Sequence, residues 1–264
     1  MAMKYNRDVA MRIFAVLEEY LPERFGKVRG DDFIEDDFIV NMDEIEDKIW
    51  AIDHTVRFYS GISKLAIIAE SLGEVAIKVP FNGCYEYSDE YYDYLHSDEY
   101  DYDDDDDEEW DFDRKFSFEY FCGGGGKCND DYCAEEYAAY KELKELGYEK
   151  FVAETELLGG INGMYILVQE FVTSMNDFDK KVINSKKSVE ASKRIREDYR
   201  SANNVEDYDW IAACVEHYGT ELSEKFFNYT EEDGYAILAD AHWGNYGYRE
   251  NGSPCILDFS DFNG

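Results

Sequence analysis

Long apolar runs and basic residues are both scarce in this sequence. No run reaches the roughly 18 apolar residues that a membrane-spanning helix needs, so we expect no membrane span and no membrane partner. Only 26 of the 264 residues are basic against 61 acidic ones, a formal net charge of −35. Such a surface repels nucleic acids and favours basic partners, so direct binding of DNA or RNA is not expected. A nucleotide site stays open, because Mg²⁺ and one or two lysines can reverse the local charge.

The N-terminal sequence also lacks the features of a secretory signal peptide. MAMKYNRDVAMRIF has no basic start followed by an apolar stretch and a small-residue cleavage site. We therefore expect a cytoplasmic protein whose six cysteines are reduced thiols. With 45% hydrophobic residues, the chain is long enough for one large domain or two lobes with a core.

The order of the predicted elements, strands with one helix followed by helices and a small terminal hairpin, predicts an α+β fold in two lobes, a β-rich N-lobe and a helical C-lobe that the family resemblance described below implies is reduced. The predicted helices cover residues 7–21, which Pro22 stops, 133–147, 175–201 and 205–228. Antiparallel strands are predicted within residues 54–80, a second hairpin within 151–172, and a final hairpin that turns at Glu250–Pro254. These elements divide the chain into a helical extension (1–53), an N-lobe (54–172) and a minimal C-lobe (173–264).

An acidic insert, residues 84–134, interrupts the predicted N-lobe. Between Glu86 and Asp113 there are 16 acidic residues and no Lys or Arg. A charge block of this density repels itself and is typical of a solvated loop. The KFSFEYF stretch that follows is expected to pair as an extra strand. Cys122, Cys128 and Cys133 could hold zinc with Cys84 and His96, although their spacing is not that of a CxxC pair.

The segment VAIK (Val75–Lys78) places one lysine on an otherwise apolar strand. Burying an unpaired ammonium group costs several kcal/mol, so a buried Lys78 requires an anion. Glu135 or Glu136 on the following predicted helix could supply it. The alternative is a solvated lysine on an edge strand.

The C-terminal stretches ADAHWGN and CILDFS gather polar residues in a short span. Asp240 and Asn245 are five residues apart, and Asp258 follows thirteen residues later, after an apolar strand. A Mg²⁺ ion on nucleotide phosphates takes one or two carboxylate or amide oxygens from the protein. Asn245 and Asp258 could supply these oxygens, which leaves Asp240 to accept a proton from an attacking hydroxyl. His242 could orient this loop or cap its turn.

Together these motifs resemble the protein-kinase-like superfamily, in particular the atypical and small-molecule kinases such as aminoglycoside kinases. The resemblance runs from about residue 54 to the end of the chain and implies an ATP- and Mg²⁺-dependent kinase. It implies that Lys78, oriented by Glu136, holds the phosphates and that Asp240 is the catalytic base. It further implies that Asn245 and Asp258 bind the metal. The adenine would be lined by the backbone of Gln169, Glu170 and Val172. We prefer Glu136 to Glu135 because it lies one turn before Tyr140 on the face expected to pack inward.

The sequence departs from that family's pattern in several places. Gly61 is the only glycine of the nucleotide-covering loop, so Ser60, Ser63 and Lys64 are expected to contact phosphate. The chain ends six residues after Asp258, so we expect no platform for a peptide substrate. Ser260 stands at the third position of the DFS motif.

A different class of function also fits the sequence. The charge of −35 and the insert favour an interaction protein on a kinase-like scaffold, inactive or weakly active, whose acidic surface binds a basic or nucleic-acid-binding partner. Eight basic residues within 180–200 could bind a phosphorylated substrate, pair with the insert or form an exposed helix face.

Overall fold

The computed structural model describes most of the chain outside the acidic insert. The described residues are 3–21, 39–40, 42–60, 64–80, 83–86, 115–118, 132–161, 163–174, 186–205, 208–232, 235–238, 241 and 244–259.

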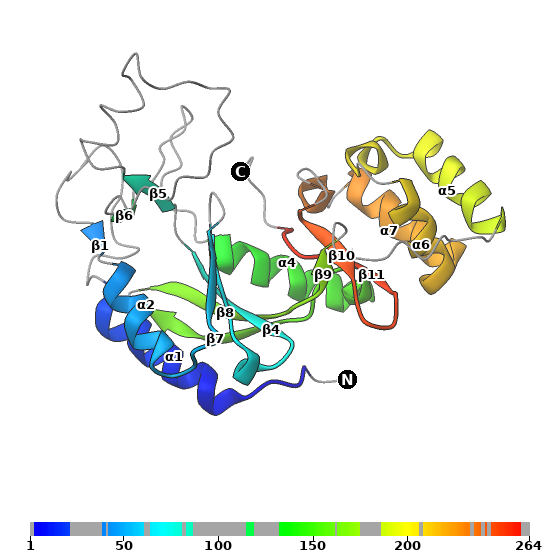
Figure 1. The fold of residues 1–264 in the computed structure, drawn as a ribbon. Coiled ribbons are helices and arrows are strands. Elements are labelled where there is room, and N and C mark those ends of the chain that lie inside the picture. The colour runs from blue at the N-terminus through cyan, green and yellow to red at the C-terminus, as the bar shows by residue number, and fades with distance from the viewer. Residues whose placement is uncertain are drawn as a thin grey trace, which may run out of the picture.

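A five-stranded antiparallel sheet lies between helices (Figure 1). Its strands are β2 (Arg57–Ser60), β3 (Lys64–Ile68), β4 (Val75–Pro80), β7 (Thr155–Ile161) and β8 (Met164–Glu170). They follow the spatial order β2-β3-β4-β8-β7. This arrangement confirms the strands predicted within 54–80 and the hairpin predicted within 151–172.

One face of this sheet is apolar and is covered by α1 (Arg7–Tyr20) and α2 (Met42–Trp50). Side chains alternate between the two faces of a strand, so Val75, Ile77 and Val79 of β4 point to the same face. They belong to one buried cluster with Ile13 and Leu17 of α1. Burying each such side chain contributes about 1.5–3 kcal/mol. The predicted first helix is confirmed; its N-cap, Asn6, accepts a hydrogen bond from the Val9 N–H at 3.4 Å.

The opposite face of the sheet is covered by α4 (Tyr132–Leu146), which contacts β4, β7 and β8. The helix predicted over 133–147 is therefore confirmed. It ends before Gly147, whose φ of 80° is a left-handed conformation that favours glycine.

A second hydrophobic cluster joins the end of α4 to the C-terminal half of the chain. Its helices are α5 (Lys186–Asp198), α6 (Tyr208–Tyr218) and α7 (Thr220–Glu232). The prediction of one long helix over 205–228 was wrong, because the chain turns at Gly219, whose φ is 87°. Of the helix predicted over 175–201, residues 186–198 form α5, and 175–185 lie outside the described residues.

The predicted terminal hairpin is confirmed as β10 (Tyr246–Tyr248) and β11 (Pro254–Ile256), beside which β9 (Thr173–Ser174) pairs. A third sheet contains β1 (Ile39–Val40), β6 (Lys115–Phe118) and β5 (Gly83–Glu86), so the extra strand predicted after the acidic block of the insert is present. Four 3₁₀ turns complete the described elements: η1 (Glu70–Leu72), η2 (Glu149–Phe151), η3 (Arg200–Asn204) and η4 (Tyr235–Leu238).

The fold is thus α+β, with six α-helices in the described part of the chain. No helix in that part is both long and apolar enough to cross a membrane.

Candidate functional site

The face of the sheet that meets α4 carries buried polar side chains. In the β3–β4 register Ala66 pairs with Lys78, so Lys64 and Lys78 lie diagonally on the same face. In the β4–β8 register Ala76 pairs with Gln169, which places Gln169 on that face as well. The alternation that makes one face apolar therefore aligns two lysines and a glutamine on the other.

The carboxylate of Glu136 connects these three side chains. Glu136 is fully buried in α4, and its Oε2 accepts from the Lys64 Nζ at 2.7 Å. Its Oε1 accepts from the Lys78 Nζ at 2.8 Å and from the Gln169 Nε2 at 2.5 Å. Of the two helix carboxylates considered for Lys78, Glu136 is the one that pairs with it.

The C-terminal hairpin brings Asp258 to the same cluster. The Lys64 Nζ donates to the Asp258 Oδ1 at 2.5 Å, and the Lys78 Nζ donates to the Leu257 carbonyl at 2.8 Å. The Asp258 side chain keeps 23% of its exposure, whereas that of Lys64 keeps 5%. Two lysines of the sheet, a carboxylate of α4 and a carboxylate after β11 thus form one network.

The charges of this network balance. Lys64 and Lys78 contribute two positive charges, and Glu136 and Asp258 contribute two negative ones. Burial lowers the pKa of Lys64, but the carboxylates of Glu136 and Asp258 outweigh burial and raise it above the usual lysine value. Lys64 is therefore charged throughout the neutral and moderately alkaline range.

Asn245 and Asp258 lie at the open end of the β10–β11 hairpin. Tyr246 pairs with Ile256, and the Asn245 carbonyl accepts from the Leu257 N–H at 2.7 Å. An amide and a carboxylate at neighbouring positions are hard oxygen donors of the kind Mg²⁺ takes from a protein when phosphates and water supply its other ligands. The donor set fits Mg²⁺ bound together with a nucleotide. Among the described residues, no group of three or more His, Cys, Asp or Glu side chains could hold a metal alone.

The end of β8 positions Glu136 through a side chain and forms backbone hydrogen bonds with neighbouring segments. The Gln169 side chain also donates to the Thr155 Oγ1 at 3.1 Å, which fixes the amide that orients Glu136. The N–H groups of Glu170 and Phe171 donate to the carbonyls of Glu154 and Glu74 at 2.8 and 3.0 Å. Val172 is therefore the better candidate of this stretch for a backbone contact with adenine.

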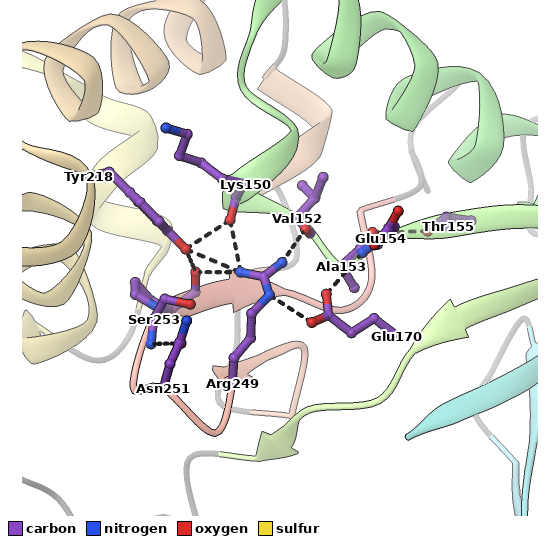
Figure 2. Close-up of polar contacts among 11 residues, drawn as sticks. Lys150, Val152, Ala153, Glu154, Thr155, Glu170, Tyr218, Arg249, Asn251 and Ser253 are labelled. Atoms are coloured by element: carbon purple, nitrogen blue, oxygen red, sulfur yellow. Dashed lines mark hydrogen bonds and ion pairs between the residues drawn. The ribbon is translucent and has the colours of Figure 1, made fainter. Parts of the chain in front are cut away.

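Arg249 fastens the hairpin to the end of β8. Figure 2 shows its guanidinium between the Glu170 carboxylate, the carbonyls of Lys150 and Val152, and the Tyr218 hydroxyl. The Nε donates to Glu170 at 2.8 Å, and the other nitrogens donate to Val152 at 2.9 Å and to Lys150 at 3.0 Å. Since Asn245 and Asp258 flank this hairpin, Arg249 sets their position relative to the sheet.

Several predicted residues lie outside the described part of the chain. They include the expected base and two expected phosphate contacts: Asp240, Gly61, Ser63, together with His242, Cys122, Cys128 and residues 87–113 of the acidic stretch. Cys133 is described and is buried; like Cys214 and Cys255, it forms no disulfide within the described part of the chain.

Sequence reasoning missed three roles. It treated Lys64 as a phosphate contact of the covering loop, not as a partner of Glu136 and Asp258, and it considered only the backbone of Gln169. Strand parity could have indicated both, because these residues are polar at positions that share a face with Lys78. Nothing in the sequence singled out Arg249. The chain matches no protein-family model, no curated protein and no solved structure.

Proposed function

We propose that this chain is an ATP- and Mg²⁺-dependent phosphotransferase that acts on a hydroxyl group. One observation carries the proposal: a buried lysine on the third strand of the sheet pairs with a glutamate of the following helix, beside the aspartate after the hairpin. A lysine–glutamate pair and a metal-binding aspartate are both required in protein kinases.

The roles follow from donors and charges. An ammonium group has three N–H donors, and Lys78 uses two of them on Glu136 and Leu257. The third is available for a phosphate oxygen, while Glu136 and Gln169 hold the lysine in place. Positioning and charge stabilisation of this kind account for most of the catalysis in phosphoryl transfer.

The proposed transfer step requires one proton acceptor. The hydroxyl oxygen forms a bond to the γ-phosphorus, the bond between that phosphorus and the ADP oxygen breaks, and the proton of the hydroxyl goes to the Asp240 carboxylate. Asn245 and Asp258 would hold Mg²⁺, which when bound neutralises charge on the phosphate oxygens. The Asp240 role rests on the motif alone.

A thermal-shift titration with ATP, with and without Mg²⁺, tests nucleotide binding. A ligand at 100 times its Kd stabilises the folded state by about 2.7 kcal/mol, or roughly 5–11 °C in Tm for a chain of this size. Lys78→Met should remove the shift. An unchanged Tm at millimolar Mg·ATP in the wild-type protein contradicts the proposal.

Turnover is tested separately with Asp240→Asn. Water can replace the unknown acceptor hydroxyl, so slow release of ADP from ATP is a usable assay. The variant should lose this activity while it retains the ATP-dependent Tm shift. Equal ADP release by the variant and the wild type would rule out Asp240 as the base.

A further inference from the structure

Glu136 is shared by two buried lysines, but only one of them contacts the expected metal ligand. Lys64 donates to both Glu136 and Asp258, whereas Lys78 donates to Glu136 and to the Leu257 carbonyl. The Lys64 ammonium therefore holds an oxygen of the carboxylate that would bind Mg²⁺.

The charges of this network balance only while no cation is bound to Asp258. With two ammonium groups and two carboxylates the network is neutral, as a buried cluster requires. If the Asp258 carboxylate binds a cation instead, Lys64, Lys78 and Glu136 retain a net charge of +1. A cluster with that charge, one part of which is a flexible lysine side chain, suits a phosphate oxygen.

We propose that Lys64 and the divalent cation compete for Asp258, and that the Lys64 ammonium, once displaced from Asp258, pairs with a phosphate oxygen of the nucleotide. The inference rests on the proposed function for its second half, whereas the competition requires the observed Lys64–Asp258 contact and the binding of a divalent cation by Asp258. Lys64 is thus a positioning residue that couples metal binding to phosphate binding.

Weak binding of Mn²⁺ in the absence of nucleotide, with water in place of the phosphate ligands, tests the competition. Mn²⁺ takes the same oxygen ligands as Mg²⁺ and is followed by the EPR signal of the free ion, at 0.15 M KCl to screen the acidic surface. Lys64→Met should raise the affinity of one Mn²⁺ site about tenfold, because the cation no longer displaces a charge-assisted hydrogen bond. Adding Asp258→Asn to this variant should abolish the gain.

Two matched variants separate competition from altered packing. Lys78→Met removes the same positive charge from the network but no hydrogen bond to Asp258, so its gain in Mn²⁺ affinity should be clearly smaller than that of Lys64→Met. Lys64→Arg keeps the charge and should resemble the wild type. Equal Mn²⁺ affinities in the wild type and Lys64→Met overturn the inference, as does an equal gain in Lys78→Met.

ATP-dependent Tm shifts test the second half of the inference, the pairing of the displaced Lys64 ammonium with a phosphate oxygen. In Lys64→Met, the increase in ATP affinity that Mg²⁺ produces should be smaller than in the wild type, although Mn²⁺ alone binds more tightly. If Lys64→Met merely damaged the structure, both the binding of Mn²⁺ alone and the effect of Mg²⁺ on ATP affinity would be weaker than in the wild type.

Asp258→Asn supplies a test that does not depend on the folding of Lys64→Met. It removes the Asp258 carboxylate that Lys64 contacts, so metal-free ATP should bind several-fold more tightly than to the wild type; equal or weaker binding overturns the second half. A wild-type protein that shows no ATP-dependent shift overturns the proposed function instead, and the Mn²⁺ comparison still decides the competition.

Discussion

Replacing Glu136 by glutamine tests whether one carboxylate holds the polar face of the sheet together. The Glu136 side chain is fully buried, and those of Lys64 and Lys78 are 5% and 10% exposed. The change raises the charge of the network from zero to +1. Removing one partner of a buried ion pair costs about 3–5 kcal/mol. We expect the lower value, because Lys64 retains Asp258 and Lys78 retains the Leu257 carbonyl.

A loss of about 3 kcal/mol lowers the Tm by roughly 6–12 °C for a protein of this size. Thermal unfolding followed by circular dichroism at pH 7 measures it, with urea titration as a second method. Glu145→Gln is the matched control: it neutralises an exposed carboxylate of the same helix and should change stability by less than about 0.5 kcal/mol.

A double-mutant cycle tests whether the effects of changing Lys78 and Glu136 depend on each other. Lys78→Met combined with Glu136→Gln leaves Lys64 and Asp258, whose charges cancel. The double variant should therefore be less destabilised than the sum of the two single changes. Two results would refute the view that both lysines depend on Glu136. One is a double variant whose loss of stability equals the sum of the two single losses, and the other is a Glu136→Gln protein with the same Tm as the Glu145→Gln control.

Three further outcomes are expected. Arg249→Met removes hydrogen bonds to part-buried acceptors on Glu170 and Val152 and should lower the Tm by several degrees, whereas Arg194→Met, from an exposed pair at 3.6 Å, should cost less than about 1 kcal/mol. Gly159→Ala should destabilise the protein by about 1–3 kcal/mol, because its Cβ would lie 2.7 Å from the Phe14 ring; Phe14→Leu should reverse much of this loss, and no reversal would argue against that contact. Burial raises the pKa of Cys255 and that of Tyr140 to about 12. Since the unfolded groups lose their protons near pH 9–10, the stability that these groups contribute is fully present below about pH 9 and is lost as the pH rises toward 12. Urea midpoints that stay level from pH 8 to pH 11 would contradict this.

Local patterns predicted the elements of this fold better than its long-range contacts. Alternating apolar residues indicated β4, and glycine-containing turns marked the hairpins. The single long helix over 205–228 failed because its helical periodicity continues through Gly219, and only the left-handed φ there reverses the chain. The Lys78–Glu136 pair could be proposed from an isolated charge on an apolar strand. The contact between Lys64 and Asp258 joins residues 194 apart in sequence, and no periodicity encodes such a contact.

The two faces of the sheet show that the polar network is not needed to pack it. The same strands bury Val, Ile and Leu side chains against α1 and α2, so this backbone can be covered by apolar side chains alone. Replacing buried ion pairs by apolar side chains of similar volume is often neutral or stabilising. The two lysines and the glutamine that face α4, together with the carboxylates of Glu136 and Asp258, therefore cost the fold stability that its other face does not lose. The proposed nucleotide, bound where Asp258 remains partly exposed, would account for a polar network that packing does not require.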